Sequence, residues 1–235
     1  MESINEISES YYEALIDTDR DRALAIVEQA LVEGISPEEM VFSVVVPSID
    51  RMLTELIDSR EATLAQHYIC SKVSSEVTDK LLPLFSRKQK MKGTIILGTA
   101  RGDFHGLGKK IVGGCLRANM YHVHDLGINV KPEKFVNEAV RLNADIIGVS
   151  SMMIHTTLGE QGASMVRKII DERELQNRIK LIVGGAPYRF DSRLYKKVGA
   201  DGWSDNAMEV VDLAEKVMKK MRTKVTNTDA IAVGV

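Results

Sequence analysis

Five short predicted strands alternate with helical stretches along the second part of the chain, and this alternation constrains the fold more than any other feature. The strands are predicted at 94–98, where the run is apolar and β-rich, and at 123–126, 145–149, 179–183 and 201–203. Helical periodicity predicts helices at 108–118, 132–142, 159–171, 192–198 and 207–221. Strand–helix units in series fold into parallel sheets, so we expect an α/β domain whose five-stranded parallel sheet carries helices on both faces.

The sequence before this region indicates helices alone. Leu24, Val27 and Leu31 keep helical spacing on one face. The sequence Ser-Pro-Glu-Glu at 36–39 is a capping box with proline in the first helical turn, so we expect a helix to begin there and to be kinked at Pro47. Another amphipathic stretch covers 63–85. Helices with short connections are typical of a small bundle.

A short basic segment at 86–93 separates the two patterns and is the predicted domain boundary. We expect a helical bundle at 1–88 and the α/β domain at 89–222, with the segment between them acting as a hinge. Residues 223–235 have no partner in either pattern, so a disordered tail is predicted there.

Charge and composition exclude several classes of protein. The formal net charge is −2, from 31 basic and 33 acidic residues, which argues against a nucleic-acid-binding protein. No apolar run approaches the roughly 18 residues that span a bilayer, and the polar, acidic N-terminus resembles no targeting sequence. Cys70 and Cys115 form no CxxC pair, so we expect reduced thiols. A cytoplasmic globular protein with neither nucleic acid nor membrane as partner is predicted.

The predicted sheet also predicts where a ligand would bind. In Rossmann-like and flavodoxin-like sheets, ligands bind beyond the carboxyl ends of the strands, where the strand order reverses. The loops that follow the first, third and fourth predicted strands lie at 99–108, 150–157 and 184–187. All of them are rich in small or polar residues, so we expect the functional site there.

The first of these loops matches neither of two common phosphate-binding motifs. A Walker A motif has four residues between its first glycine and Gly-Lys-Ser/Thr. Here five residues separate Gly102 from Gly108, and Lys109 is followed by Lys110. A dinucleotide-binding motif that begins at Gly106 would need a small residue where Ile111 stands.

The same loop contains Asp103-Phe104-His105, with glycines at 106 and 108. A carboxylate two residues from a histidine can accept the proton of one ring nitrogen and leave the other to bind a metal. Glycines allow a large planar ligand to approach the backbone. The alternative is a loop histidine that binds a local aspartate and no ligand. The two companion loops at the same edge favour the ligand site.

These motifs together resemble a known family. Asp103-x-His105-x-x-Gly108, Ser150-x-Met152 and Gly184-Gly185 resemble the signature of the cobalamin-binding domain of corrinoid-dependent methyltransferases. The helical stretch before them resembles the cap bundle of that family. The most similar architecture is that of small corrinoid proteins, which carry a methyl group between a substrate-specific methyltransferase and a second methyltransferase.

The resemblance implies roles for particular residues. His105 would bind cobalt in place of the cofactor's own dimethylbenzimidazole (base-off, His-on), Asp103 would hold the imidazole, and Thr156 would complete the relay. The displaced nucleotide tail would pass beside the serine and the paired glycines. The implied cofactor contacts are Gly102, Asp103, Phe104, His105, Gly106, Gly108, Ser150, Met152, Ile154, Gly184, Gly185 and Ala186. Met152 and Ile154 depart from the leucine and threonine that are common in the family.

Other functions remain open at this point. A cobalamin-binding sensor or storage module would share the same site, and so would the small subunit of a cobalamin mutase. Outside cobalamin chemistry, a flavodoxin-like signalling or metal-binding domain could carry His105 without a corrinoid. His155 is either an alternative ligand or a polar loop residue, and His67 is either a cap residue near the cofactor or part of a helix interface.

Overall fold

The computed structural model describes residues 3–55, 62–85 and 91–232 of the chain. Contacts divide the chain into two compact units, one of Met1–Lys92 with Lys110–Tyr121 and the other of Gly93–Lys109 with His122–Val235. The predicted boundary at 88/89 and most of the proposed hinge at 86–93 lie outside the described residues. The two units are described separately below.

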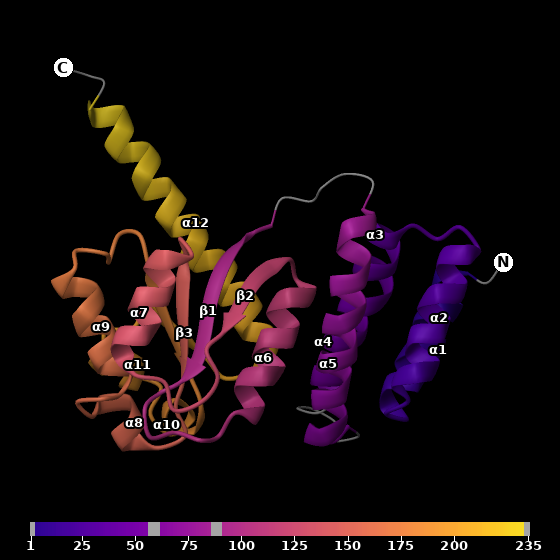
Figure 1. The fold of residues 1–235 in the computed structure, drawn as a ribbon, viewed down its shortest axis with the longest axis horizontal. Coiled ribbons are helices and arrows are strands. Elements are labelled where there is room, and N and C mark those ends of the chain that lie inside the picture. Colours follow the sequence, from indigo (N-terminus) through magenta and orange to yellow (C-terminus); the bar gives the residue numbers. More distant parts are fainter. Residues whose placement is uncertain (1–2, 56–61, 86–90, 233–235) are drawn as a thin grey trace. The chain divides into compact units, whose positions relative to one another are not determined.

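The first unit is helical, as predicted, and its helices begin at polar caps. The side chains of Ser3, Asp19, Ser36 and Thr63 each accept a backbone N–H from the first turn of the helix that follows. The elements of this unit before the sheet are α1 (Ile4–Ile16), α2 (Arg20–Val32), α3 (Pro37–Met40), the π-helical turn η1 (Val41–Val45), α4 (Val46–Thr54), α5 (Leu64–Leu81) and the 3₁₀ turn η3 (Leu82–Leu84) (Figure 1).

A π-helical turn stands where the sequence predicts a kink. Pro47 has no N–H to donate within the helix, and η1 lies immediately before it. The wider π-helical turn changes the hydrogen-bond pattern at this point, and the chain continues into α4.

Helix α6 (Leu107–Ala118) contributes residues from Lys110 onward to the first unit. Ser71 of α5 donates a hydrogen bond to the carbonyl of Ile111 at 3.0 Å. Gly114 leaves the space for that serine, because a Cβ atom at position 114 would lie 1.9 Å from the Ser71 Oγ. The sequence predicts α6 as part of the α/β domain alone, since helical periodicity does not reveal which helix packs against which.

The second unit contains the predicted sheet, and the predicted fold class is confirmed. Its strands are β1 (Gly93–Thr99), β2 (Tyr121–Asp125), β3 (Ile146–Ser150), β4 (Lys180–Gly184) and β5 (Gly202–Ser204). They lie in the order β2-β1-β3-β4-β5, so the strand order reverses between β1 and β3.

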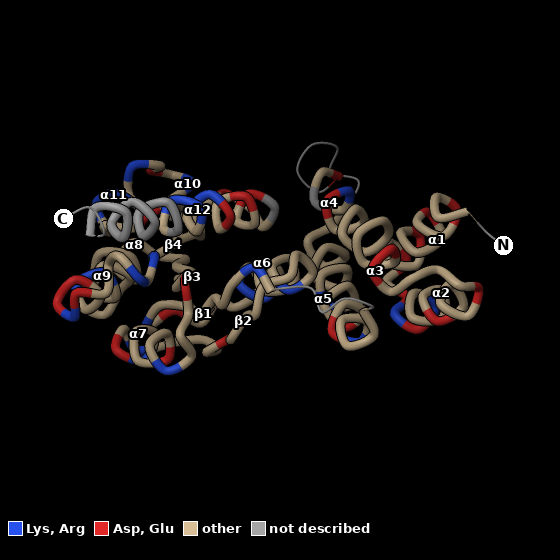
Figure 2. Tube along the Cα trace, turned by 90° about the horizontal axis from the view of Figure 1, so that it is seen from above, with Lys and Arg blue, Asp and Glu red and all other residues tan. Residues whose placement is uncertain are grey.

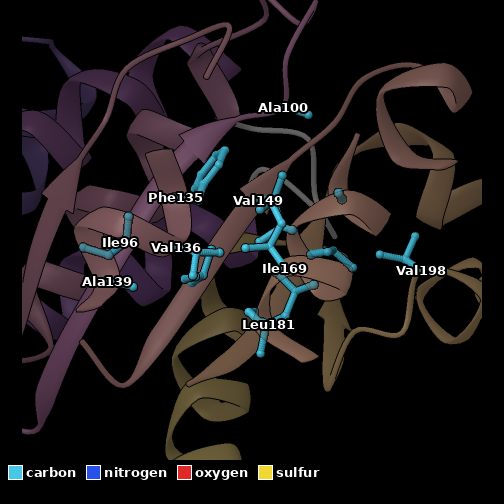
Figure 3. Close-up of a cluster of buried hydrophobic side chains, with 14 of the residues drawn as sticks. Ile96, Ala100, Phe135, Val136, Ala139, Val149, Ile169, Leu181 and Val198 are labelled. Carbon is cyan, nitrogen blue, oxygen red and sulfur yellow. The ribbon is translucent and has the colours of Figure 1, made fainter. Parts of the chain in front are cut away.

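Helices cover both faces of this sheet. Figure 2 shows α7 (Pro132–Arg141) on one face and α12 (Ala207–Ala232) on the other. The remaining helices are α8 (Ile154–Leu158), α9 (Ala163–Glu172), α10 (Ala186–Phe190) and α11 (Leu194–Val198). The core between α7, α9 and the sheet is apolar and fully buried at Phe135, Val136 and Leu181 (Figure 3). Gly98 makes room for Phe135, whose ring would lie 2.7 Å from a Cβ atom at that position.

The C-terminal helix is longer than predicted. Helix α12 continues to Ala232 and so includes residues 223–232 of the segment for which the sequence predicts a tail, while 233–235 lie outside the described residues. No glycine or proline stands between Ala207 and Ala232 to end the helix, and the next glycine is Gly234. Among the described helices, none combines the length and apolar character needed to cross a membrane.

Candidate functional site

The carboxyl ends of four strands lie in one row. Thr99 pairs with Ser150, Ser150 with Gly184, and Gly184 with Ser204. The ladder continues one residue further, because the Ala100 N–H donates to the Ser150 carbonyl at 2.9 Å and the Ser151 N–H to the Gly184 carbonyl at 3.0 Å. The structure therefore brings the three predicted loops side by side at the point where the strand order reverses.

Asp103 and His105 are in direct contact in the first loop. The Asp103 Oδ1 accepts the backbone N–H of His105 at 2.9 Å and lies 3.0 Å from the His105 Nδ1. The carboxylate side chain is 1% exposed, whereas the imidazole is 58% exposed. This contact favours a proton on Nδ1 and leaves Nε2 with its lone pair. The pair can thus offer one neutral nitrogen to a ligand or metal.

The other carboxylate oxygen of Asp103 is held by the second loop. Its Oδ2 accepts the backbone N–H of Met152 at 2.5 Å. The Thr156 hydroxyl lies 3.4 Å from the same oxygen but 2.7 Å from the Met153 carbonyl, so its single proton is better placed to donate to the carbonyl. The structure therefore brings the predicted Thr156 to the site at long range. The stronger donor, a backbone N–H, was not predicted, since residue type does not reveal it.

Large apolar side chains stay exposed around this pair of residues. Phe104 is 65% exposed and Ile154 58% exposed, and Met152 between the two loops is 48% exposed. Leu107 and Ile128 were not predicted as site residues, but they are also more than two-fifths exposed. A Cβ atom at Gly106 would lie 3.0 Å from the Ile128 side chain, so the loop after β2 borders the histidine loop. An exposed apolar cluster of this kind is typical of a binding site for a large apolar ligand.

Gly184, the last residue of β4, and Gly185 after it differ in how strictly the fold requires glycine. Gly185 has φ +116°, and a Cβ atom there would lie 2.0 Å from the Ser151 carbonyl oxygen. At Gly184 a Cβ atom would lie 3.5 Å from the Ser204 carbonyl oxygen, an ordinary contact. The fold therefore requires glycine at 185, whereas a Cβ atom at 184 would be tolerated. Ala186 follows as the first residue of α10.

Two further glycines of the first loop border open space. A Cβ atom at Gly102 or at Gly108 would meet no atom within 4 Å, although φ is +81° at Gly102. Ser150 is half-buried at the end of β3. These predicted positions leave the approach to the backbone clear.

Tyr188 of α10 supplies a polar atom that sequence reasoning missed. Its ring is fully buried, and its hydroxyl makes no hydrogen bond of ordinary geometry to the described residues, although the Ser151 side chain lies close enough to interact with it. Burial raises the pKa of this phenol, which therefore stays protonated and able to donate. Tyrosines in cores are common, so the sequence carries no signal for this role.

The sequence also singled out His155 and His67, and these two histidines differ in exposure. His155 is exposed on α8. His67 belongs to the first unit, where it is 1% exposed and neither ring nitrogen has a partner among the described residues. Burial lowers the pKa of His67 to about 4, so its ring is neutral. The described residues hold no group of three or more histidine, cysteine, aspartate or glutamate side chains that could bind a metal ion.

Two family models and several curated proteins match most of the chain. A model of the B12 binding domain matches residues 93–212, and a second B12 binding domain model matches residues 7–82. The dimethylamine corrinoid protein 2 of Methanosarcina acetivorans is 30% identical over 222 residues, which cover 93% of this chain and 99% of that protein.

Two solved structures share the fold. A cobalamin-binding protein from Desulfitobacterium hafniense has a TM-score of 0.71 at 23% identity, covering 92% of this chain and 99% of its own. The methanol:cobalamin methyltransferase complex of Methanosarcina barkeri contains a chain with a TM-score of 0.70 at 20% identity, covering 92% of this chain and 80% of its own.

Proposed function

Because the chain belongs to the B12-binding corrinoid proteins of methyltransferase systems, with cobalamin as its cofactor, we propose that it carries a methyl group between a substrate-specific methyltransferase and a second methyltransferase. The observation that supports this most is the buried Asp103 carboxylate behind an exposed His105 imidazole. A carrier needs one metal ligand of fixed orientation, and this pair offers one nitrogen.

The residues of the site fit a corrinoid. A corrin is a broad ring with apolar surface, which matches the exposed side chains of Phe104, Met152 and Ile154. A displaced nucleotide tail would pass close to the backbone at the end of β4, and Gly184 there carries no side chain to obstruct it. The buried hydroxyl of Tyr188, on the helix that follows and beside Ser151, offers a donor to a polar tail.

The chemistry that the bound cofactor supplies is the transfer of a methyl group at cobalt. His105 would hold the cobalt through its Nε2 lone pair. Asp103 would accept a hydrogen bond from the Nδ1–H, which fixes the tautomer and makes Nε2 a better donor. The Met152 N–H keeps the carboxylate in place, whereas the Thr156 hydroxyl lies 3.4 Å from the carboxylate and contributes less because it donates to the Met153 carbonyl.

Reconstitution with hydroxocobalamin tests the ligand. Protein whose histidines carry the heavy nitrogen isotope is loaded and reduced to the Co(II) state, and its electron paramagnetic resonance spectrum is recorded. We expect the nitrogen hyperfine pattern to change with the isotope and to lose that change in His105→Ala. Since the imidazole is largely exposed, the unloaded variant should unfold like the wild type. A nitrogen hyperfine pattern that does not change with the isotope would show that the benzimidazole remains bound. This result would overturn the His-on proposal.

Methyl transfer needs a second experiment. Methyltransferases recovered with the chain from its own cells are mixed with the reduced loaded protein and a panel of donors (methanol, methylamines, betaines and aryl methyl ethers). Methylation of the cofactor and its onward transfer would support a carrier. A loaded protein that no partner methylates would instead be a sensor or storage module.

A further inference from the structure

Asn129, in the loop after β2, makes three hydrogen bonds to the segment that leads to His105. Its backbone N–H donates to the Thr99 Oγ1 at 2.9 Å and to the Asp103 carbonyl at 3.0 Å. Its side-chain Oδ1 accepts the N–H of Gly102 at 2.8 Å. One residue of a different loop therefore holds the beginning and the end of the turn 99–103.

The backbone conformation at position 129 is one that asparagine tolerates better than most residues. Its φ is +53°, in the left-handed region that most side chains avoid and that asparagine and aspartate tolerate best. The Gly102 N–H that it binds also belongs to a residue with positive φ, at +81°. Asparagine thus supplies both the backbone conformation and the acceptor that this contact needs.

Asp103 is consequently held from two sides. Its main-chain carbonyl accepts bonds from the Asn129 N–H and, at 2.6 Å, from the Thr99 hydroxyl. Its carboxylate accepts the N–H of Met152 and contacts the His105 ring. A shift of the Asp103 main chain would move the carboxylate away from Met152 or His105. The bonds to the main-chain carbonyl therefore fix the geometry of the bonds to the carboxylate.

We propose that Asn129 is a positioning residue for the axial histidine: it sets the main chain at Asp103 and so the orientation of the His105 imidazole. This role rests on the proposed His-on binding of the corrinoid. Asn129 itself touches neither His105 nor, by this proposal, the cobalt, and acts only through the turn 99–103.

The chain contains a matched control. Asn143 also has positive φ, at +50°, is also exposed, and its Oδ1 accepts a bond from the Arg178 Nη2 at 2.8 Å. It lies between α7 and the first residue of β3, at the amino edge of the sheet, away from the loops of the site. Substitution there removes the same kinds of interaction without touching the turn 99–103.

The test compares Asn129→Ala, Asn129→Gly, Asn129→Asp and Asn143→Ala in the full chain. Without cofactor, amide hydrogen exchange should speed up about fivefold or more at Gly102 and Met152 in Asn129→Ala, since one lost hydrogen bond and one strained residue open the turn. Glycine restores the conformation but not the acceptor, so its effect should be smaller. Aspartate keeps both and should behave like the wild type. Asn143→Ala should leave these amides unchanged.

The loaded variants are then reduced to Co(II), and the isotope-sensitive fraction of the resonance spectrum is compared. This fraction should fall most in Asn129→Ala, less in Asn129→Gly and not in Asn129→Asp. The affinity for hydroxocobalamin should be about fivefold to tenfold weaker in Asn129→Ala. If Asn129→Ala and Asn143→Ala lower this fraction and the exchange protection equally, the positioning role is overturned. If the wild type shows no isotope-sensitive signal at all, the proposed function fails, and the exchange data on the unloaded chain still decide whether Asn129 holds the turn.

Discussion

Substitution of alanine for Gly185 should destabilise the second unit strongly. The backbone there has φ +116° and ψ 177°, a combination that side chains rarely adopt and that costs about 1–3 kcal/mol. The new Cβ atom would also lie 2.0 Å from the Ser151 carbonyl oxygen, so backbone must move by about 1 Å, at a cost of about 1–3 kcal/mol. We expect the unfolding free energy to fall by about 4 kcal/mol.

Gly184→Ala is the control for this prediction. Its Cβ atom would make an ordinary contact of 3.5 Å with the Ser204 carbonyl oxygen, so the unfolding free energy should change by less than about 1 kcal/mol. Cobalamin affinity should nevertheless fall by about tenfold or more, because the methyl group would occupy the space proposed for the nucleotide tail.

Urea unfolding of the unloaded protein measures both variants. Trp203 in β5 is the only tryptophan of the chain, so its fluorescence reports on the sheet of the second unit. A Gly185→Ala protein within about 1 kcal/mol of the wild type would refute the steric reasoning. Unchanged cobalamin affinity in Gly184→Ala would show that the tail passes elsewhere.

Three other outcomes follow from the same structure. Asp103→Asn should lower the unfolding free energy by about 2 kcal/mol in urea titrations, because one N–H partner must then face the amide's own NH₂ group. His67→Gln should make the unfolding free energy less dependent on acid. Burial lowers the pKa of the wild-type ring from 6.5 to about 4, so between these pH values only the unfolded chain takes up this proton. The unfolding free energy of the wild type should therefore fall by about 3 kcal/mol more than that of the variant between pH 7 and pH 4. Thr156→Val should disturb His-on ligation less than Asp103→Asn, in the same resonance spectra, because its hydroxyl lies closer to the Met153 carbonyl than to the carboxylate.

The sheet could be predicted from sequence because β1, β3 and β4 are short, largely apolar runs that alternate with helical stretches, whereas β2, with two histidines and an aspartate, begins two residues earlier than predicted. The helices after β3 and β4 were harder to predict from the sequence. One helix was predicted at 159–171, but the chain forms α8 and α9 with a turn between them. A Cβ atom at Gly162 would lie 2.8 Å from the Thr156 carbonyl oxygen, so this turn packs against the preceding helix. Such a tertiary contact does not appear in a hydrophobic pattern.

The residues of the candidate site also divide into some that the sequence could predict and others that it could not. Asp103 and His105 could be predicted because their side chains carry the chemistry and stand two residues apart. The N–H of Met152 and the left-handed Asn129 could not, because they act through backbone atoms that every residue possesses. Tyr188 could not be predicted either, because the burial of its hydroxyl depends on tertiary packing.

The difference in burial between Asp103 and His105 suggests how the fold prepares the site before any cofactor arrives. A buried carboxylate is tolerated only when its oxygens accept hydrogen bonds, and both oxygens of Asp103 accept backbone N–H groups of the protein itself. The carboxylate is therefore satisfied without a ligand, and the exposed imidazole only has to keep the orientation that the carboxylate gives it. Cofactor binding then requires little rearrangement of this loop, so the bonds that hold Asp103 in place should affect cobalamin affinity although none of them reaches the cobalt.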